Sequence, residues 1–133
     1  MIVDTSVLIA ILRNELAAAR FSNALEMEPH PKMSVVSLVE AGVVVDSARN
    51  PLLSRQLDEL VRVAGIEVLP VTVEQGRLAR EAYRDFGRGS GHPARLNFGD
   101  CFSYALAKES GEPLLFQGAD FGQTDLRLAK TPR

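Results

Sequence analysis

Short apolar segments alternate with helical stretches along this chain, and this alternation is the feature that most restricts its fold. We predict strands at 1–4, 33–36, 66–71 and 114–116, with a possible edge strand at 126–128. Helices are predicted between them at 6–13, 15–27, 37–50, 52–64, 72–86 and 97–110. Apolar strands separated by helices are typical of a parallel sheet covered on both faces. The sequence therefore predicts an α/β fold with a central parallel sheet of four or five short strands.

Several helix ends are marked by residues that satisfy free backbone groups. Ser6 and Ser37 are expected to cap the helices that follow them, and Glu40 completes a capping-box pattern with Ser37. Asn97 precedes the last long helix, and Gly111 is expected to end it.

Length and composition indicate one soluble domain, 1–133, in a reducing compartment. The chain has 133 residues and one cysteine, Cys101, so no intramolecular disulfide can form. No apolar run approaches the roughly 20 residues of a membrane span. We therefore expect a cytoplasmic protein without a membrane partner.

Four carboxylates stand in otherwise apolar surroundings near predicted strand ends or helix starts: Asp4, Glu40, Asp100 and Asp120. Each has a structural explanation when taken alone, because acids cap helices and fill turns. Together they would lie beyond the carboxyl ends of the strands, where α/β folds bind ligands. Clustered carboxylates are suitable ligands for a hard divalent cation. Capping and metal binding both remain open, and they are compatible.

Other chemistries lack their motifs. The chain contains no glycine-rich dinucleotide loop, no P-loop and no nucleophile elbow around a serine. Cys101 heads an apolar helix face, which favours a buried and unreactive thiol.

Arginine is unevenly distributed despite a net charge of −2. Five arginines lie within 77–95: Arg77, Arg80, Arg84, Arg88 and Arg95. Guanidinium groups match phosphate geometry, so this segment could hold a nucleic-acid backbone. The alternative is a solvated helix face on which Glu81 and Asp85 pair with the arginines.

Four segments resemble the PIN-domain family, and more narrowly the VapC ribonuclease toxins of bacterial toxin–antitoxin pairs. They are MIVDTSVL around Asp4, SVVSLVEA around Glu40, HPARLNFGDCFSYALAK around Asp100 and PLLFQGADFGQTD around Asp120. The third segment is the most specific, and together they span 1 to about 125 in family order. One departure is Gln117, which stands where many relatives carry lysine.

The resemblance implies a PIN fold and an endoribonuclease that depends on Mg²⁺ or Mn²⁺ and cleaves a structured RNA such as tRNA. It assigns the catalytic and metal-binding roles to the four carboxylates above, with Asp4 and Asp100 as direct ligands. Ser6 and Arg95 are expected to contact the RNA.

The resemblance also implies a cognate VapB-type antitoxin, operator DNA bound only through that antitoxin, and a homodimer within a hetero-oligomer. Two other readings remain. A magnesium-binding signalling receiver would have paired acids after the first strand, whereas Thr5 and Ser6 follow Asp4 here. A catalytically silent PIN-like module would bind partners without cleaving RNA.

Overall fold

The structure is a computed structural model that describes residues 1–131, in which four parallel strands form one sheet in the order β3-β2-β1-β4. The strands are β1 (Ile2–Val3), β2 (Lys32–Ser34), β3 (Glu67–Leu69) and β4 (Leu114–Leu115). The helices are α1 (Thr5–Leu12), α2 (Ala18–Met27), α3 (Val35–Ser47), α4 (Pro51–Val63), α5 (Val73–Phe86) and α6 (Phe98–Ser110), followed by a 3₁₀ turn, η1 (Phe121–Gln123). The predicted α/β class and parallel sheet are confirmed.

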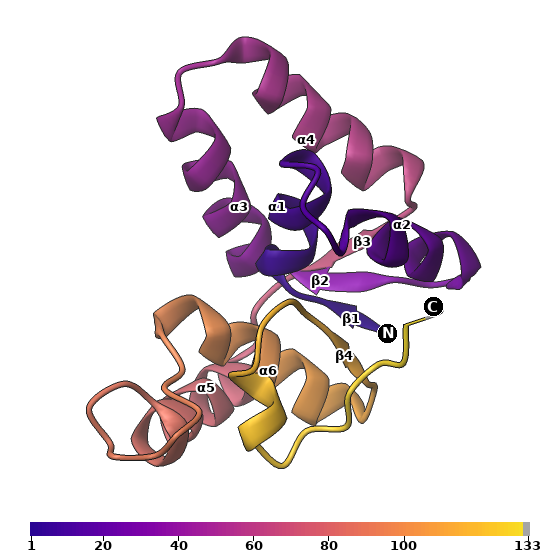
Figure 1. Ribbon diagram of the computed structural model, residues 1–133. Coiled ribbons are helices and arrows are strands. Elements are labelled where there is room, and N and C mark those ends of the chain that lie inside the picture. The colour runs from indigo at the N-terminus through magenta and orange to yellow at the C-terminus, as the bar shows by residue number, and fades with distance from the viewer. Residues whose placement is uncertain (132–133) are drawn as a thin grey trace.

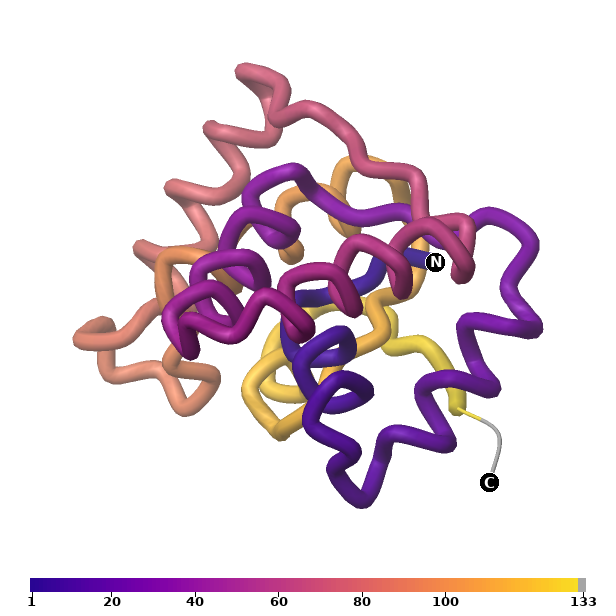
Figure 2. The backbone as a smooth tube through the Cα atoms, turned by 90° about the horizontal axis from the view of Figure 1, so that it is seen from above, coloured from indigo at the N-terminus to yellow at the C-terminus, as the bar shows by residue number. Residues whose placement is uncertain are grey.

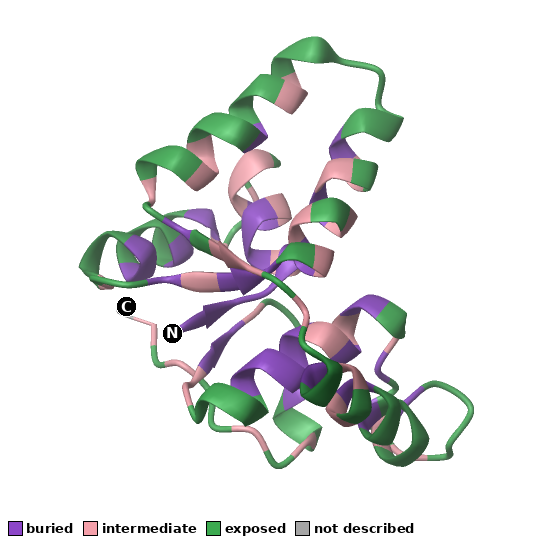
Figure 3. Ribbon diagram, turned by 180° about the vertical axis from the view of Figure 1, so that it is seen from behind, coloured by how far each residue is buried: buried purple, intermediate pink, exposed green. Residues whose placement is uncertain are grey.

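Helices cover both faces of the sheet. Figure 1 shows α1 to α4 on one side of the strands and α5 and α6 on the other. Alternation along the strands divides the core accordingly, because neighbouring strand residues point to opposite faces. Val3 and Leu115 pack with the first group of helices, and Ile2 and Leu114 pack with α5 and α6. Figure 3 shows the central strands β1 and β4 buried between these layers, and both consist of apolar residues, whereas the edge strand β3 is partly exposed and begins with Glu67.

The carboxyl ends of the strands meet at one edge of the sheet, since all the pairings are parallel. There β1 leads directly into α1 and β2 directly into α3. The loop 87–97 between α5 and α6 projects from the body of the molecule in both ribbon and tube views (Figure 1 and Figure 2). This edge therefore collects helix starts from separate parts of the chain.

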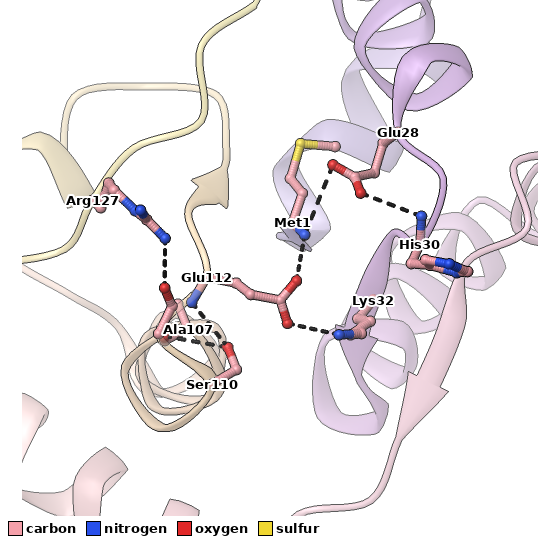
Figure 4. A network of polar contacts seen from close by, with 9 residues as sticks. Met1, Glu28, His30, Lys32, Ala107, Ser110, Glu112 and Arg127 are labelled. Atoms are coloured by element: carbon pink, nitrogen blue, oxygen red, sulfur yellow. Dashed lines mark hydrogen bonds and ion pairs between the residues drawn. The ribbon is translucent and has the colours of Figure 1, made fainter.

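A polar network ties the opposite end of the sheet together (Figure 4). Glu112 accepts hydrogen bonds from Lys32 Nζ at 2.7 Å and from the Met1 amino group at 2.6 Å. The Lys32 hydrogen bond, with that from the amino group, lowers the pKa of Glu112. These contacts link β1, β2 and the turn before β4, away from the acidic edge.

Two predicted helix caps are wrong. Helix α1 begins at Thr5 with Asp4 as its cap, two residues before the predicted Ser6. Helix α3 begins at Val35 with Ser34 as its cap, so the predicted capping box from Ser37 does not form. Ser37 is instead fully buried, and its hydroxyl contacts a serine of α6.

Other boundaries also differ from the prediction. Helix α2 begins at Ala18, later than predicted, because Asn14 takes a left-handed backbone conformation that turns the chain after α1. The possible edge strand at 126–128 is reduced to one bridge between Leu114 and Leu128. Asn97 and Gly111 do begin and end α6 as predicted. Within residues 1–131, no helix has the length and apolarity required to cross a bilayer.

Candidate functional site

Asp4 lies at the junction of β1 and α1 and is only 3% exposed. Its Oδ2 accepts a hydrogen bond from the backbone N–H of Ser6 at 3.0 Å, which caps α1. Its Oδ1 accepts a hydrogen bond from Ser103 Oγ at 2.5 Å. Both oxygens are therefore fixed by donors from the surrounding fold, as a buried carboxylate requires.

A chain of hydrogen-bonded, buried hydroxyl groups leads from Asp4 into the protein interior. Ser37 Oγ and Ser103 Oγ lie 3.0 Å apart, and both side chains are fully buried. Because Ser103 has one hydroxyl proton and directs it to Asp4, Ser37 must donate to Ser103. Thr5 Oγ1 donates to the carbonyl of Ser37 at 2.7 Å. This network joins α1, α3 and α6 beneath one carboxylate.

Asp100 is held by the capping box at the start of α6. Its Oδ2 accepts from the Asn97 N–H at 2.9 Å, and Asn97 Oδ1 accepts from the Asp100 N–H at 2.8 Å. Burial raises the pKa of Asp100 to about 6, and the negative charges of Asp4, Glu40 and Asp120 add to the effect. The hydrogen bond from Asn97 opposes this rise without cancelling it. Asp100 is thus both a helix cap and a destabilised anion.

Glu40 reaches the same region from α3 by packing against the backbone of α6. A Cβ atom at Gly99 would overlap the Glu40 carboxylate, so any larger residue at this position would force the Glu40 side chain to move. Burial raises the pKa of Glu40; the nearby Thr5 hydroxyl lowers it, and the charge of Asp4 raises it further. The close approach of Glu40 and Gly99 therefore sets how near this carboxylate comes to Asp100.

Three of the four predicted acids line one pocket of about 350 Å³, which we call the acidic pocket. Its lining consists of Asp4, Thr5, Ser6, Ile9, Glu15, Glu40, Val44, Asn97, Asp100 and Gln117. Asp120 is exposed at the start of η1 and lies outside this lining. It is near enough for its charge to raise the pKa of Asp100.

Ser6 lies at the rim of the acidic pocket and connects α1 to the segment after β4. Its Oγ accepts a hydrogen bond from the Gln117 N–H at 2.9 Å, so its own proton remains available to a ligand. Gln117 Nε2 in turn donates to Glu15 Oε2 at 2.6 Å. Glu15 is a fifth carboxylate at this rim that sequence reasoning missed, because no local motif marks it.

Arg95, the other predicted RNA contact, is exposed in the loop before α6 and does not line the acidic pocket. Its backbone is left-handed, with φ of 52°. A contact between Arg95 and RNA stays a prediction.

The donor chemistry of the acidic pocket suits a hard divalent cation, because its charged groups are carboxylates; burial raises the pKa of Asp100 and Glu40, and the negative charges of neighbouring acids raise it further. Across residues 1–131, however, no three His, Cys, Asp or Glu side chains are grouped closely enough to hold one ion alone. The residues therefore fit a cation bound by one or two carboxylates and otherwise by water, the usual arrangement for Mg²⁺.

Comparison with known proteins shows which family the sequence of this chain matches. The PIN-domain family model matches residues 1–126. Ribonuclease VapC28 of Mycobacterium tuberculosis is 57% identical over 129 residues, which cover 97% of each chain.

Solved structures share the fold at low sequence identity. Mycobacterium tuberculosis VapC20, titled a sarcin–ricin loop cleaving toxin, aligns with a TM-score of 0.76 at 17% identity and covers 97% of this chain and 98% of its own. VapBC2 of Rickettsia felis, solved with a promoter DNA fragment, gives a TM-score of 0.73 at 13% identity over 98% of each chain.

Proposed function

Since this chain belongs to the PIN-domain family and, within it, to the VapC-type ribonuclease toxins, we propose that it is a metal-dependent endoribonuclease that cleaves phosphodiester bonds in a structured RNA. The convergence of Asp4, Glu40 and Asp100 on one pocket carries the proposal. These acids come from α3, α6 and the end of β1, so only the folded chain assembles them.

The acidic pocket would hold Mg²⁺ or Mn²⁺ through Asp4 and Asp100, with Glu40 and the outlying Asp120 acting through water. When bound, a divalent cation supplies charge neutralisation and activates water for attack on phosphorus. Asp4 suits direct ligation because its two oxygens are already oriented by Ser6 and Ser103.

The protein groups around the cation have separate tasks. Asp100 is ionised at neutral pH because its pKa of about 6 lies below that range. Ser6 can donate its hydroxyl proton to a phosphate oxygen while it accepts from the Gln117 N–H. Placing the substrate phosphate against such fixed donors is how a site gains rate without a covalent intermediate.

The partners follow from the same family membership. We propose a VapB-type antitoxin that covers the acidic pocket, operator DNA bound through that antitoxin, and a homodimer within the complex. The VapBC2 assembly, solved with promoter DNA, supports this as an analogy of fold. We also retain as predictions that 1–133 is one PIN domain and that it acts in the bacterial cytoplasm.

The proposal is tested by incubating the purified, antitoxin-free protein with total RNA and with tRNA, and mapping new 5′ ends. We expect cleavage with Mg²⁺ or Mn²⁺, none with EDTA, and none from an Asp4→Asn variant. Asp58→Asn, an exposed acid on α4, is the matched control and should cleave normally. Cleavage that persists in EDTA or in Asp4→Asn would refute the mechanism.

One observation favours the silent module as the second candidate: in the described part of the chain, no three acids already surround a single point. That candidate predicts folded wild-type protein that binds its antitoxin yet cleaves no RNA at any metal concentration. The receiver reading has no support, since the family match covers nearly the whole chain.

A further inference from the structure

The first turn of α6 borders two separate hollows. Asn97 and Asp100 line the acidic pocket, whereas Phe98, Cys101 and Phe102 line a second pocket of about 320 Å³. Residues at positions i, i+3 and i+4 share one side of a helix, which explains the division. The second hollow, which we call the aromatic pocket, is therefore one helix face away from the proposed catalytic acids.

Phe98 is unusually exposed for a phenylalanine. Its side chain is 73% exposed, and its ring packs edge-on against Phe102 with centroids 5.0 Å apart. Tyr83 of α5 also lines the aromatic pocket and is 46% exposed. Most of the Phe98 side chain is therefore open to solvent next to the acidic pocket. Covering this apolar ring with a ligand would be favourable.

The wall opposite Phe98 is cationic. Arg80 lines the aromatic pocket and also a neighbouring hollow that contains Arg77 and Arg84. Arg77 and Arg84 make exposed ion pairs within their own helix, at 3.0 and 2.8 Å, and such pairs are weak. In the part of the chain that the structure describes, Arg80 has no ion-pair partner. Its guanidinium is therefore available to an anion.

We propose that the aromatic pocket is a nucleobase subsite, in which a base next to the cleaved phosphate stacks on Phe98 while Arg80 binds an adjoining phosphate. The inference rests on the proposed ribonuclease function. Single-stranded nucleic acids are bound by this combination of aromatic platforms and cations, and stacking tolerates any base. RNA recognition commonly uses unpaired bases splayed onto aromatic rings.

The size and charge of the aromatic pocket suit a nucleobase and its phosphate. A pocket of about 320 Å³ lies at the lower end of the range for small-ligand sites. The guanidinium of Arg80 at the rim complements a phosphate.

The test uses a Phe98→Trp variant, because the chain contains no other tryptophan. Fluorescence is titrated in EDTA with a short oligoribonucleotide and with an abasic oligomer of equal length and charge. We expect quenching by the base-bearing strand and little by the abasic one. Proteins without the tryptophan are titrated by the fluorescence anisotropy of dye-labelled strands. For Phe98→Ala, Kd for the base-bearing strand should rise about 5- to 150-fold relative to wild type, while Kd for the abasic strand stays unchanged. Phe98→Tyr should restore wild-type binding.

Arg80→Gln should weaken binding of both strands and lower the slope of log Kd against log salt by about one phosphate contact. Leu52→Ala and Arg55→Gln, exposed residues of α4, are matched controls and should change neither strand's affinity. Melting temperatures of all variants confirm that they are folded.

Equal affinity of wild type and Phe98→Ala for the base-bearing strand would overturn the subsite. The subsite would also be overturned if fluorescence changed with protein concentration alone and Phe98→Ala altered the sedimentation coefficient, since the face would then join two copies. Both readouts are independent of cleavage. If metal-dependent cleavage is intact but quenching does not depend on the base, only the subsite proposal is refuted. If quenching depends on the base but no cleavage occurs, only the ribonuclease proposal is refuted.

Discussion

Replacing Asp100 by asparagine should stabilise the free protein while it abolishes cleavage. The pKa of Asp100 is raised from the ordinary 3.8 to about 6, so the folded state disfavours the ionised form. At about 1.36 kcal/mol per pKa unit, the ionised carboxylate costs up to about 3 kcal/mol above pH 6. Because Asp100 is partly exposed, solvent screening reduces this to about 2 kcal/mol. Asparagine keeps an oxygen that can accept from the Asn97 N–H, so the capping contact should survive.

The stability cost of the ionised Asp100 carboxylate should increase with pH. Below the unfolded pKa of 3.8 both states carry a neutral Asp100 and the penalty is absent; it grows as pH rises and levels off above the folded pKa of about 6. The gain from Asp100→Asn should therefore be full at pH 7.5 and about a third as large at pH 4.5. For a domain of this size, about 2 kcal/mol corresponds to roughly 8 °C in Tm.

The assay is urea and thermal unfolding of antitoxin-free protein in EDTA at pH 4.5 and 7.5. Asp125→Asn is the control of opposite sign. Burial alone would raise the pKa of Asp125, but hydrogen bonds from Lys108 and Tyr104 outweigh it and lower the pKa. This variant should lose stability by a similar amount at both pH values, since its titration lies below pH 4. An Asp100→Asn variant no more stable than wild type at pH 7.5, or equally stabilised at pH 4.5, would refute the reasoning.

Three further substitutions probe other contacts. Gly99→Ala should displace Glu40 and lower kcat at least 10-fold with a folded protein by circular dichroism; unchanged kcat would mean that Glu40 need not approach α6. Ser103→Ala should cost about 1–3 kcal/mol in urea unfolding and weaken Mn²⁺ binding measured by calorimetry, because one oxygen of Asp4 loses its donor. Glu112→Gln should lose about 1 kcal/mol or less at pH 7 without affecting cleavage, and its deficit should disappear below pH 4.5 as the wild-type carboxylate is protonated; a pH-independent deficit would contradict the ion pairs as its cause.

Local chemistry made part of this fold predictable. The capping residues Asn97 and Asp100 and the terminal Gly111 act within a few residues, and α6 begins and ends where they indicate. The choice between Ser34 and Ser37 as the cap of α3 could not be read locally, because both serines stand at the strand-to-helix junction. A tertiary contact decides it: the Ser37 hydroxyl is used by α6, sixty-six positions along the chain.

The residues of the candidate site were likewise only partly predictable from the sequence. Asp4, Glu40 and Asp100 could be named in advance because each interrupts an apolar stretch near a strand end or a helix start. Glu15 could not, since it reaches the rim only through Gln117 and the turn that follows α1. Asp120 follows a strand in sequence as expected, yet the 3₁₀ turn leaves it exposed and outside the lining of the acidic pocket.

Two of the acids, Asp4 and Asp100, are positioned by helix capping. Asp4 caps α1 and Asp100 caps α6, so backbone N–H groups hold one oxygen of each carboxylate before any ligand arrives. A cap needs only one oxygen of a carboxylate, which leaves Asp100 an oxygen free for a cation or phosphate. Capping therefore supplies preorganisation, and the remaining cost is electrostatic, carried by the raised pKa of Asp100. This is why asparagine can separate the two roles: it preserves the position of the side chain and removes only the charge.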